Sequence, residues 1–162
     1  EHDTSSMAEA SDYHIDSVVI SDPRPFHPQR LWQVYNHYLG TGIYRSKGFF
    51  WLPSRDKLQL LWNQTAGSVG LEVVNYWKIA TLEDDSLNLL PEERAEMRRR
   101  LEGQSPEFGD RHCRLTVIGD RDGLDAFAEA VRECFCTPEE VQAWKAGAVF
   151  EDPWPKALVG LE

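Results

Sequence analysis

The sequence predicts an α+β fold, a two-layer sandwich in which a mainly antiparallel sheet carries its helices on one face. Two observations predict it. Five segments have the aromatic and branched residues of strands, at 13–21, 42–53, 58–63, 71–79 and 113–119. Two of these segments follow each other across a short connection that contains glycine, as the strands of an antiparallel hairpin do.

The first strand, at 13–21, ends before Pro23 and Pro25, because proline cannot donate to a strand ladder. Pro28 suits the first turn of a helix, which we place at about 28–39. The apolar stripe of this helix is predicted to consist of Leu31, Val34, Tyr35 and Tyr38.

The second strand, at 42–53, has the most informative pattern. Because side chains alternate along a strand, four of them share one face: Arg45, Lys47, Phe49 and Trp51. The opposite face then carries Tyr44, Ser46, Gly48, Phe50 and Leu52. A cationic and aromatic face on the sheet of an acidic protein indicates a contact surface.

The hairpin is followed by a change of pattern. Leu58, Leu60 and Trp62 share one face of its first strand, and the second strand runs from Leu71 to Ile79. Residues 82–107 are strongly charged, with a helix at about 91–101 that has only a thin apolar stripe. We expect this region to be a solvated excursion from the domain.

The last third of the sequence returns to core patterns. Cys113, Leu115 and Val117 alternate along a strand, and apolar residues recur at helical spacing over 123–135. Thr137 and Glu140 form a capping box for a further helix that runs to Ala146 and is closed by Gly147. The proline-rich tail at 150–155 is expected to dock as an irregular segment.

Length and charge limit the function. The chain has 162 residues and a net charge of −10, which disfavours nucleic acid and anionic membranes as partners. It contains no apolar run of 18 residues that would predict a membrane-spanning helix. Residues 1–12 resemble a linker, 13–162 are expected to form one domain, and the start at Glu1 suggests a piece of a longer protein.

The sequence contains no catalytic motif that we can identify. It has no GxxxxGKS/T loop, no GxGxxG after a strand, no GxSxG elbow and no HExxH. We therefore predict no catalytic residues and no cofactor-binding residues. Phe108 to Arg111 contain an Asp-Arg pair before a strand, which we interpret as a turn with a local ion pair.

Four residues are candidates for a metal site: Cys113, Cys134, Cys136 and His112. Cys113 and Cys134 fall at apolar core positions, and strand alternation sends His112 to the face opposite Cys113. We therefore predict no metal site, and keep direct metal binding as an alternative. The odd number of cysteines in a chain of this size predicts reduced thiols and a cytoplasmic location.

A second alternative is an RNA-binding sheet. Lys47, Gly48 and Phe49 match the start of the RNA-recognition signature, whose aromatic residues stack on bases. Phe50 stands where that signature has a small residue, and Pro53 interrupts the strand. Together with the acidic charge, these departures favour a sheet face that is covered by another domain or segment.

Several motifs together resemble the C-terminal domain of the CobW family of P-loop GTPases, which includes metallochaperones and metalloenzyme activators. They lie in the family's order across residues 17–155, and they are RPFHPQRL at 24–31, RSKGFFWL at 45–52, YW at 76–77, FGDR at 108–111, VIG at 117–119 and DPWP at 152–155. Each motif alone is short, but the ordered set is fairly specific.

The resemblance implies a two-layer α+β domain that follows a GTPase domain. GTP, Mg and a transition metal such as Zn or Co would belong to the full-length family, and no cofactor is expected in this chain. We predict a non-catalytic accessory domain whose partners are the GTPase domain of the same protein and a client metalloprotein. The predicted contact residues are Arg45, Lys47, Phe49, Trp51, Asp110 and Arg111.

Overall fold

The computed structural model describes residues 15–38, 42–65, 67–156 and 158–159, so the predicted linker at 1–12 lies outside the described residues. The strands are β1 (Ile15–Asp22), β2 (Ile43–Phe50), β3 (Leu58–Thr65), β4 (Ser68–Tyr76), β5 (Cys113–Asp120) and β6 (Leu158–Val159). The helices are α2 (Pro28–Tyr38), α3 (Lys78–Glu83), α4 (Pro91–Arg100), α5 (Arg121–Arg132) and α6 (Pro138–Lys145), with the short 3₁₀ helices η1 (Pro53–Arg55) and η2 (Asp85–Leu87).

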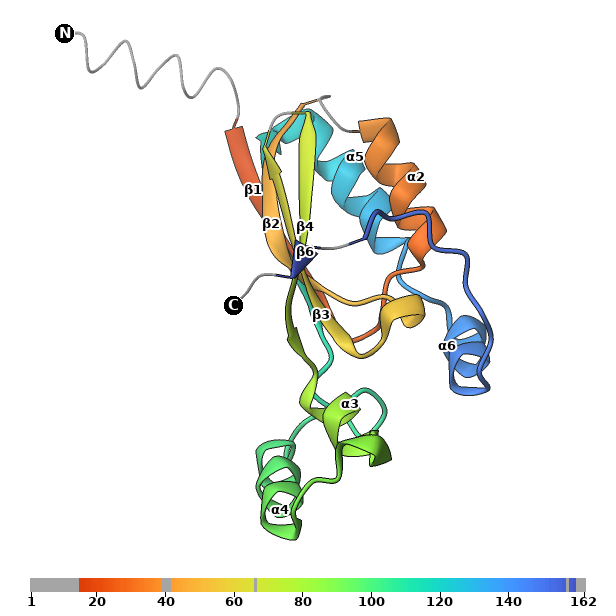
Figure 1. Cartoon of the computed structure of the whole chain (residues 1–162). Helices are drawn as coiled ribbons and strands as arrows, with labels where there is room; N and C mark the ends of the chain where they lie inside the picture. Colours follow the sequence, from red (N-terminus) through yellow and green to blue (C-terminus); the bar gives the residue numbers. More distant parts are fainter. Residues whose placement is uncertain (1–14, 39–41, 66, 157, 160–162) are drawn as a thin grey trace, which may run out of the picture.

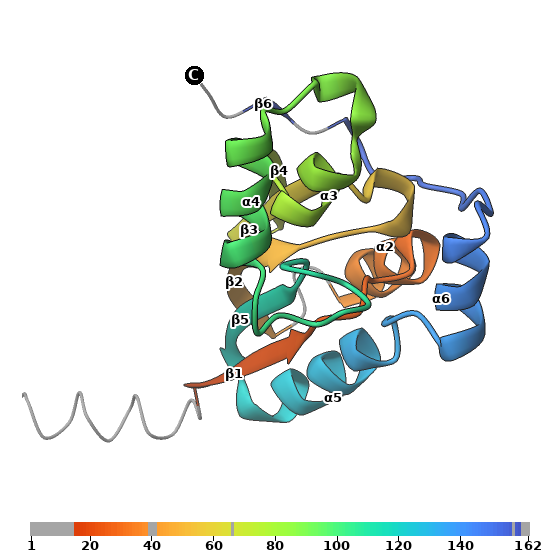
Figure 2. The ribbon, with the colours of Figure 1, turned by 90° about the horizontal axis from the view of Figure 1, so that it is seen from below.

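The strands form one sheet in the order β1-β5-β2-β3-β4-β6. The pairs among the first five are antiparallel, and the two-residue β6 adds to the edge of β4 in parallel. Helices α2 and α5 lie on one side of the sheet (Figure 1), and the view in Figure 2 places α6 on that side too. The predicted α+β fold with helices on one face of a mainly antiparallel sheet is therefore confirmed.

The core lies between the sheet and these helices. Helix α5 buries Leu124, Phe127, Ala128 and Val131 at helical spacing. Helix α2 buries Leu31 and Tyr35, two members of the predicted stripe. The core face of the sheet contributes Ile20, Phe50, Leu60, Trp62, Leu115 and Val117.

The hairpin is confirmed as β3 and β4, but its second strand begins and ends earlier than predicted. The strand ends at Tyr76, and Ile79 belongs to α3. Asp110 explains the change, because its carboxylate accepts hydrogen bonds from the backbone N–H groups of Lys78 (2.8 Å) and Ile79 (3.0 Å). These two bonds satisfy donors that a helix start leaves unpaired.

The charged excursion also behaves as predicted. Helices α3 and α4 lie beyond one end of the strands (Figure 1). Helix α4 buries none of its residues, in keeping with its charged sequence. Helix α4 therefore does not cover the face of the sheet that lies away from α2 and α5.

The second strand differs from its prediction at both ends. A bulge at Ile43 and Arg45 shifts the register with β5, and Tyr44 is 47% exposed. The prediction that Tyr44 shares a face with Ser46 and Phe50 is therefore wrong, because those two side chains are buried. At the other end the strand stops at Phe50, so strict alternation does not extend to the residues that follow.

Helix α6 is tied to the start of α2 by an ion pair. Arg30 donates from its two terminal nitrogens to the two carboxylate oxygens of Glu140, at 2.6 and 2.8 Å. Arg30 also donates to the carbonyl oxygen of Phe135, and Thr137 and Glu140 form the predicted capping box. Charge-assisted, two-pronged hydrogen bonds of this kind are stronger than neutral ones.

This ion pair predicts a pH-dependent stability. The hydrogen bonds from Arg30 lower the pKa of Glu140 from 4.5 to about 2. A carboxyl whose pKa is lower in the folded state stabilises the fold above its unfolded pKa, and this contribution is lost as the pH falls from 4.5 towards 2. We expect the difference in unfolding free energy between the wild type and Glu140→Gln to shrink across that range in urea titrations.

The neighbouring Glu139→Gln is the matched control, because Glu139 is exposed and makes no ion pair within the described part of the chain. Its difference from the wild type should stay constant over the same pH range. A constant difference for Glu140→Gln as well would contradict the role assigned to the ion pair.

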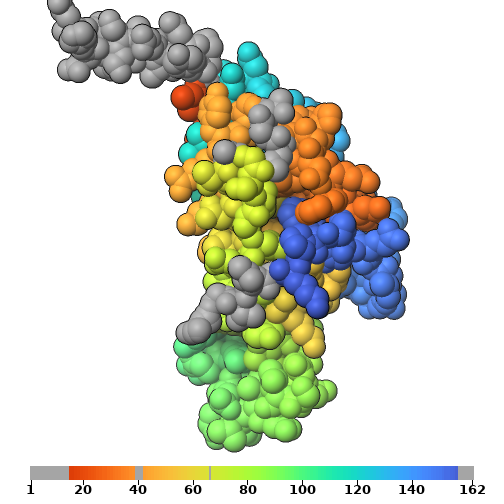
Figure 3. All heavy atoms as spheres, turned by 45° about the horizontal axis from the view of Figure 1, so that its top comes forward, coloured from red at the N-terminus to blue at the C-terminus, as the bar shows by residue number. Residues whose placement is uncertain are grey.

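The proline-rich tail docks as an irregular segment, as predicted. Asp152 accepts hydrogen bonds from Ser54 (2.6 Å) and from Nε of Arg55 (2.8 Å). Trp154 is buried and donates from its indole nitrogen to the carbonyl oxygen of Pro28 (2.9 Å). The tail, blue in Figure 3, thereby lies between α2 in orange and β4 in yellow-green.

Candidate contact face on the open side of the sheet

The face of the sheet away from α2 and α5 carries three of the predicted contact residues. Arg45, Lys47 and Phe49 alternate along β2 and are exposed on this side, and Phe49 is 40% exposed despite its large apolar ring. We call this side the open face. Antiparallel sheets often leave one face in water, so exposure alone does not mark a contact surface. The residues on the open face decide whether it is one.

The open face continues across β5. Opposite Arg45, Lys47 and Phe49 lie Ile118, Thr116 and Arg114, respectively, and directly opposed side chains share a face. Ile118 is exposed, and so is Val19, which opposes Thr116 from β1. Three cations and three apolar side chains therefore meet on three adjacent strands.

Sequence reasoning missed Arg114, Ile118 and Val19. A signal for two of them was present: if Leu115 and Val117 face the core, Arg114 and Ile118 must face the other way. What the sequence did not reveal was that β5 lies between β1 and β2. Only this order places Arg114 beside Phe49.

The cations of the open face differ from other arginines of the described chain in their pairing. Among the described residues, Arg45, Lys47 and Arg114 make no ion pair and no side-chain hydrogen bond. Arg30 and Arg55, in contrast, are both paired with carboxylates. In a chain with a net charge of −10, a face of unpaired cations produces a local positive field that suits an acidic partner.

Trp51 does not belong to the open face, and its prediction as an exposed contact residue is wrong. The strand ends one residue before it, and the indole ring turns into the core, where it is fully buried. Its nitrogen donates to the carbonyl oxygen of Pro23 (2.9 Å), and its ring lies against Phe108 and Trp144. Trp51 is therefore a core residue.

Asp110 and Arg111 are placed at the base of the excursion and not on the open face. Asp110 caps α3, as described above. Arg111 is only 4% exposed, and its guanidinium carbon lies 5.2 Å from the ring of Trp51 and 5.4 Å from that of Trp144. The six predicted contact residues thus divide into two separate places.

The four candidate metal ligands do not converge. The thiol of Cys113 donates to the carbonyl oxygen of Arg24 and that of Cys134 to the carbonyl oxygen of Ala130. His112 pairs with Ser21 through Nε2 at 2.7 Å, away from the core side where Cys113 is buried. Within the described ranges, no three His, Cys, Asp or Glu residues are placed to hold a metal ion.

The protonation of the thiols agrees with this arrangement. Burial raises the pKa of Cys134 to about 11 and that of Cys136 to about 12, and it raises the pKa of Cys113 as well. Metals bind the thiolate form, which these environments disfavour. The three free cysteines therefore act as small core residues and do not fit a metal centre.

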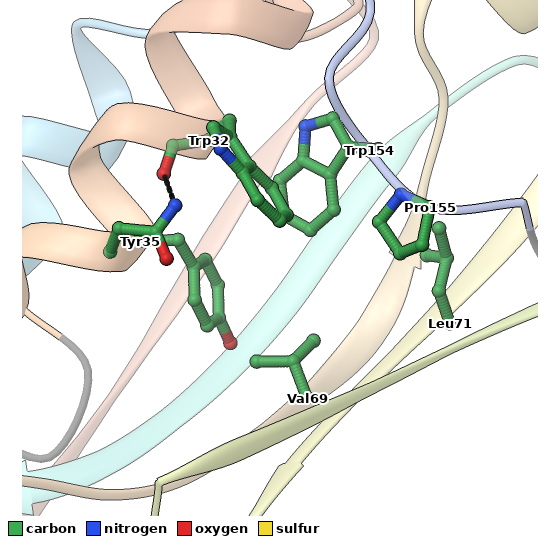
Figure 4. Close-up of a pocket in the computed structure, with 7 residues that line it drawn as sticks. Trp32, Tyr35, Val69, Leu71, Trp154 and Pro155 are labelled. Atoms are coloured by element: carbon green, nitrogen blue, oxygen red, sulfur yellow. Dashed lines mark hydrogen bonds between the residues drawn. The ribbon is translucent and has the colours of Figure 1, made fainter.

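An apolar cleft of about 200 Å³ lies between α2, β4 and the tail (Figure 4). Trp32 and Trp154 meet edge to face with 5.0 Å between ring centres, and Val69 and Leu71 lie below them. Its one titratable group, Tyr35, has a pKa raised by burial and a hydroxyl that pairs with Ser46. The cleft therefore offers no acid–base chemistry.

These features define a small α+β domain with one covered face, one open cationic face and a charged excursion. The chain matches the sequence model of the cobalamin synthesis protein cobW C-terminal domain over residues 15–135. The chain belongs to this family. It is thus a C-terminal domain of the kind found in a family of GTPases, as the ordered motifs indicated. None of its described helices is long and apolar enough to span a membrane.

Two relatives carry descriptive names. A Mycobacterium tuberculosis protein named as a zinc chaperone is 36% identical over 113 residues, which are 67% of this chain and 26% of that protein. The zinc-regulated GTPase metalloprotein activator 1 of Dictyostelium discoideum is 28% identical over 139 residues, 83% of this chain and 28% of that protein. The chain thus spans about a quarter of each relative's length.

The fold also resembles a solved structure. The Zn(II)-bound YjiA GTPase from E. coli matches with a TM-score of 0.51 and 14% sequence identity, over 80% of this chain and 32% of that one. At this identity the match supports the fold alone.

Proposed function

We propose that this domain is a non-catalytic accessory domain of a CobW-type GTPase, which packs on the GTPase domain and helps to recognise a client metalloprotein. The observation that carries the proposal is the open face, where Arg45, Lys47 and Arg114, which make no ion pair with any described residue, lie around exposed Phe49 and Ile118. Aromatic and arginine side chains are the typical anchors of protein interfaces.

The physical case rests on two contributions. Burial of the exposed apolar side chains would stabilise a complex by about 25 cal/mol for each Å² removed from water. The unpaired cations would speed association with an acidic surface and select against basic ones.

The names of the relatives support zinc as the metal of the full-length protein and GTP as its nucleotide. The buried free thiols favour a reducing compartment such as the cytoplasm.

The double variant Arg45→Glu with Lys47→Glu tests the open face. We expect it to weaken binding of the GTPase domain or of the client at least about tenfold in isothermal titration, with the wild-type affinity falling as salt rises. Both side chains are exposed, so the fold should be retained.

The control is Arg99→Glu with Arg100→Glu, which makes the same change of charge on exposed α4. It should leave both affinities unchanged. If the control weakens binding and the β2 variant does not, the excursion and not the open face is the contact surface. Retention of RNA at low salt would instead support the RNA-binding alternative.

The non-catalytic part of the proposal has its own test. These 162 residues contain no phosphate-binding loop of the GxxxxGKS/T type. The purified domain incubated with GTP and Mg²⁺ should therefore release phosphate no faster than a buffer blank. Hydrolysis above that level would contradict the assignment.

A further inference from the structure

The outer side of helix α5 carries four exposed carboxylates, which we call the α5 stripe: Asp122, Asp125, Glu129 and Glu133, the last at the C-cap of the helix. Their spacing of three and four residues places them on one side of the helix, away from the buried Leu124 and Val131. Among the described residues, none of the four makes an ion pair or a hydrogen bond through its carboxylate. Arg121, at the edge of the stripe, faces Asp16 at 3.6 Å instead.

The α5 stripe is complementary in charge to the open face. Arg45, Lys47 and Arg114 make no ion pair with a described residue, and the same holds for the carboxylates of the stripe. The chain thus presents an unpaired cationic surface and an unpaired acidic surface. Complementary potentials of this kind steer two surfaces together and fix their register.

The spacing of the charges also agrees. Alternate side chains of a strand lie about 6.8 Å apart, and side chains four residues apart on a helix lie about 6 Å apart along its axis. Arg45 and Lys47 on β2 can therefore reach Asp125 and Glu129 of another molecule together. Ala126 is exposed next to these carboxylates, and its small side chain leaves room for an apolar group from the opposite surface.

The two surfaces point in opposite directions. Helix α5 packs on one side of the sheet through its apolar residues and turns the stripe outward, and the open face is the other side of the same sheet (Figure 1). One molecule therefore cannot bring its stripe to its own open face, and two molecules cannot make both contacts with each other. A contact between such unlike surfaces is head to tail and continues from copy to copy unless it closes into a ring.

We propose that the open face binds the α5 stripe of a second copy of this chain. Arg45 and Lys47 pair with Asp125 and Glu129 of that copy, and the exposed ring of Phe49 packs at its Ala126. This inference rests on the proposed function in one respect, namely that the open face is a contact surface. It adds that a second copy covers this face until another partner displaces it.

The net charge limits the strength of this contact. Two chains that each carry a net charge of −10 repel each other, and this repulsion opposes the local attraction between the two surfaces. We therefore expect a Kd on the order of 0.1–1 mM for the contact between copies. A client or GTPase domain with micromolar affinity would displace the second copy.

Sedimentation equilibrium of the chain at concentrations around this Kd tests the inference. The average mass of the wild type should rise with concentration and pass that of a dimer, because the contact is head to tail. One variant changes the open face, Arg45→Glu with Lys47→Glu, and another changes the stripe, Asp125→Asn with Glu129→Gln. Each alters only exposed side chains and should weaken self-association at least about tenfold.

A mixture of the two variants provides the sharpest result. The open-face variant still has its stripe, and the stripe variant still has its open face, so one contact can form between them. The mixture should therefore associate more strongly than either variant alone and stop at a dimer. The control is Glu92→Gln with Glu102→Gln, which removes the same two charges from exposed positions of the excursion. It should associate at least as strongly as the wild type.

The inference is overturned if the wild type stays monomeric, if the stripe variant associates like the wild type, or if the mixture is no larger than its components. These outcomes are separate from the test of the proposed function. If the wild type stays monomeric while the β2 variant still weakens binding of the client, only this inference fails. If the chain associates as described but the β2 variant binds the GTPase domain and the client like the wild type, the proposed function fails.

Discussion

Gly48→Ala is expected to lower the free energy of unfolding by about 3 kcal/mol, the upper range for forcing atoms into a packed core. A β-carbon at this position would lie 2.0 Å from the carbonyl oxygen of Arg114 and 2.7 Å from Cα of Leu115. Both are backbone atoms of β5, which cannot retreat because it is held between β1 and β2. The two strands would have to separate at the centre of the sheet.

Gly70→Ala is the matched control, since Gly70 also lies within a strand. The atom nearest to its added β-carbon is the carbonyl oxygen of Asn63 at 3.6 Å, an ordinary contact. Its effect should stay within about 0.5 kcal/mol. Urea unfolding followed by tryptophan fluorescence measures both variants. Equal stabilities for the two would mean that β2 and β5 are not packed as closely as the structure has them.

The fold could be predicted because its signals are local. Alternation predicted the strands, helical spacing predicted α5, and the Thr137 capping box marked the start of α6. The wrong predictions concern residues whose conformation depends on a partner far away in the sequence. Tyr44 is exposed because of a bulge against β5, and Ile79 is helical because Asp110, 31 residues away, caps α3.

The candidate site was predicted only in part for the same reason. Arg45, Lys47 and Phe49 share a face by alternation alone, and the structure places them together. Trp51 fits the same alternation of odd-numbered residues but lies past the end of the strand. There the chain turns and buries the ring against Phe108 and Trp144. Arg114 joins the face only through the strand order, which no local pattern specifies.

The DPWP motif raises the question of whether the tail is an appendage or part of the core. Trp154→Ala is expected to lower the free energy of unfolding by about 4 kcal/mol, the cost typical of removing a buried tryptophan. The ring lies within 6.1 Å, centre to centre, of Trp32, Tyr35, Phe50 and Trp62. Its removal would also leave the carbonyl oxygen of Pro28 without this donor.

Val149→Ala provides the comparison in the same segment, because Val149 is 97% exposed and its truncation should cost less than about 0.5 kcal/mol. Trp154→Phe separates packing from hydrogen bonding, since it keeps an aromatic ring and loses the indole N–H. We expect it to fall between the wild type and Trp154→Ala in urea unfolding. A loss below 1 kcal/mol for Trp154→Ala would mean that the sheet and α2 form a stable core without the tail. The tail would then be free to leave α2 and β4, and the cleft beneath Trp154 would not be a fixed feature of the domain.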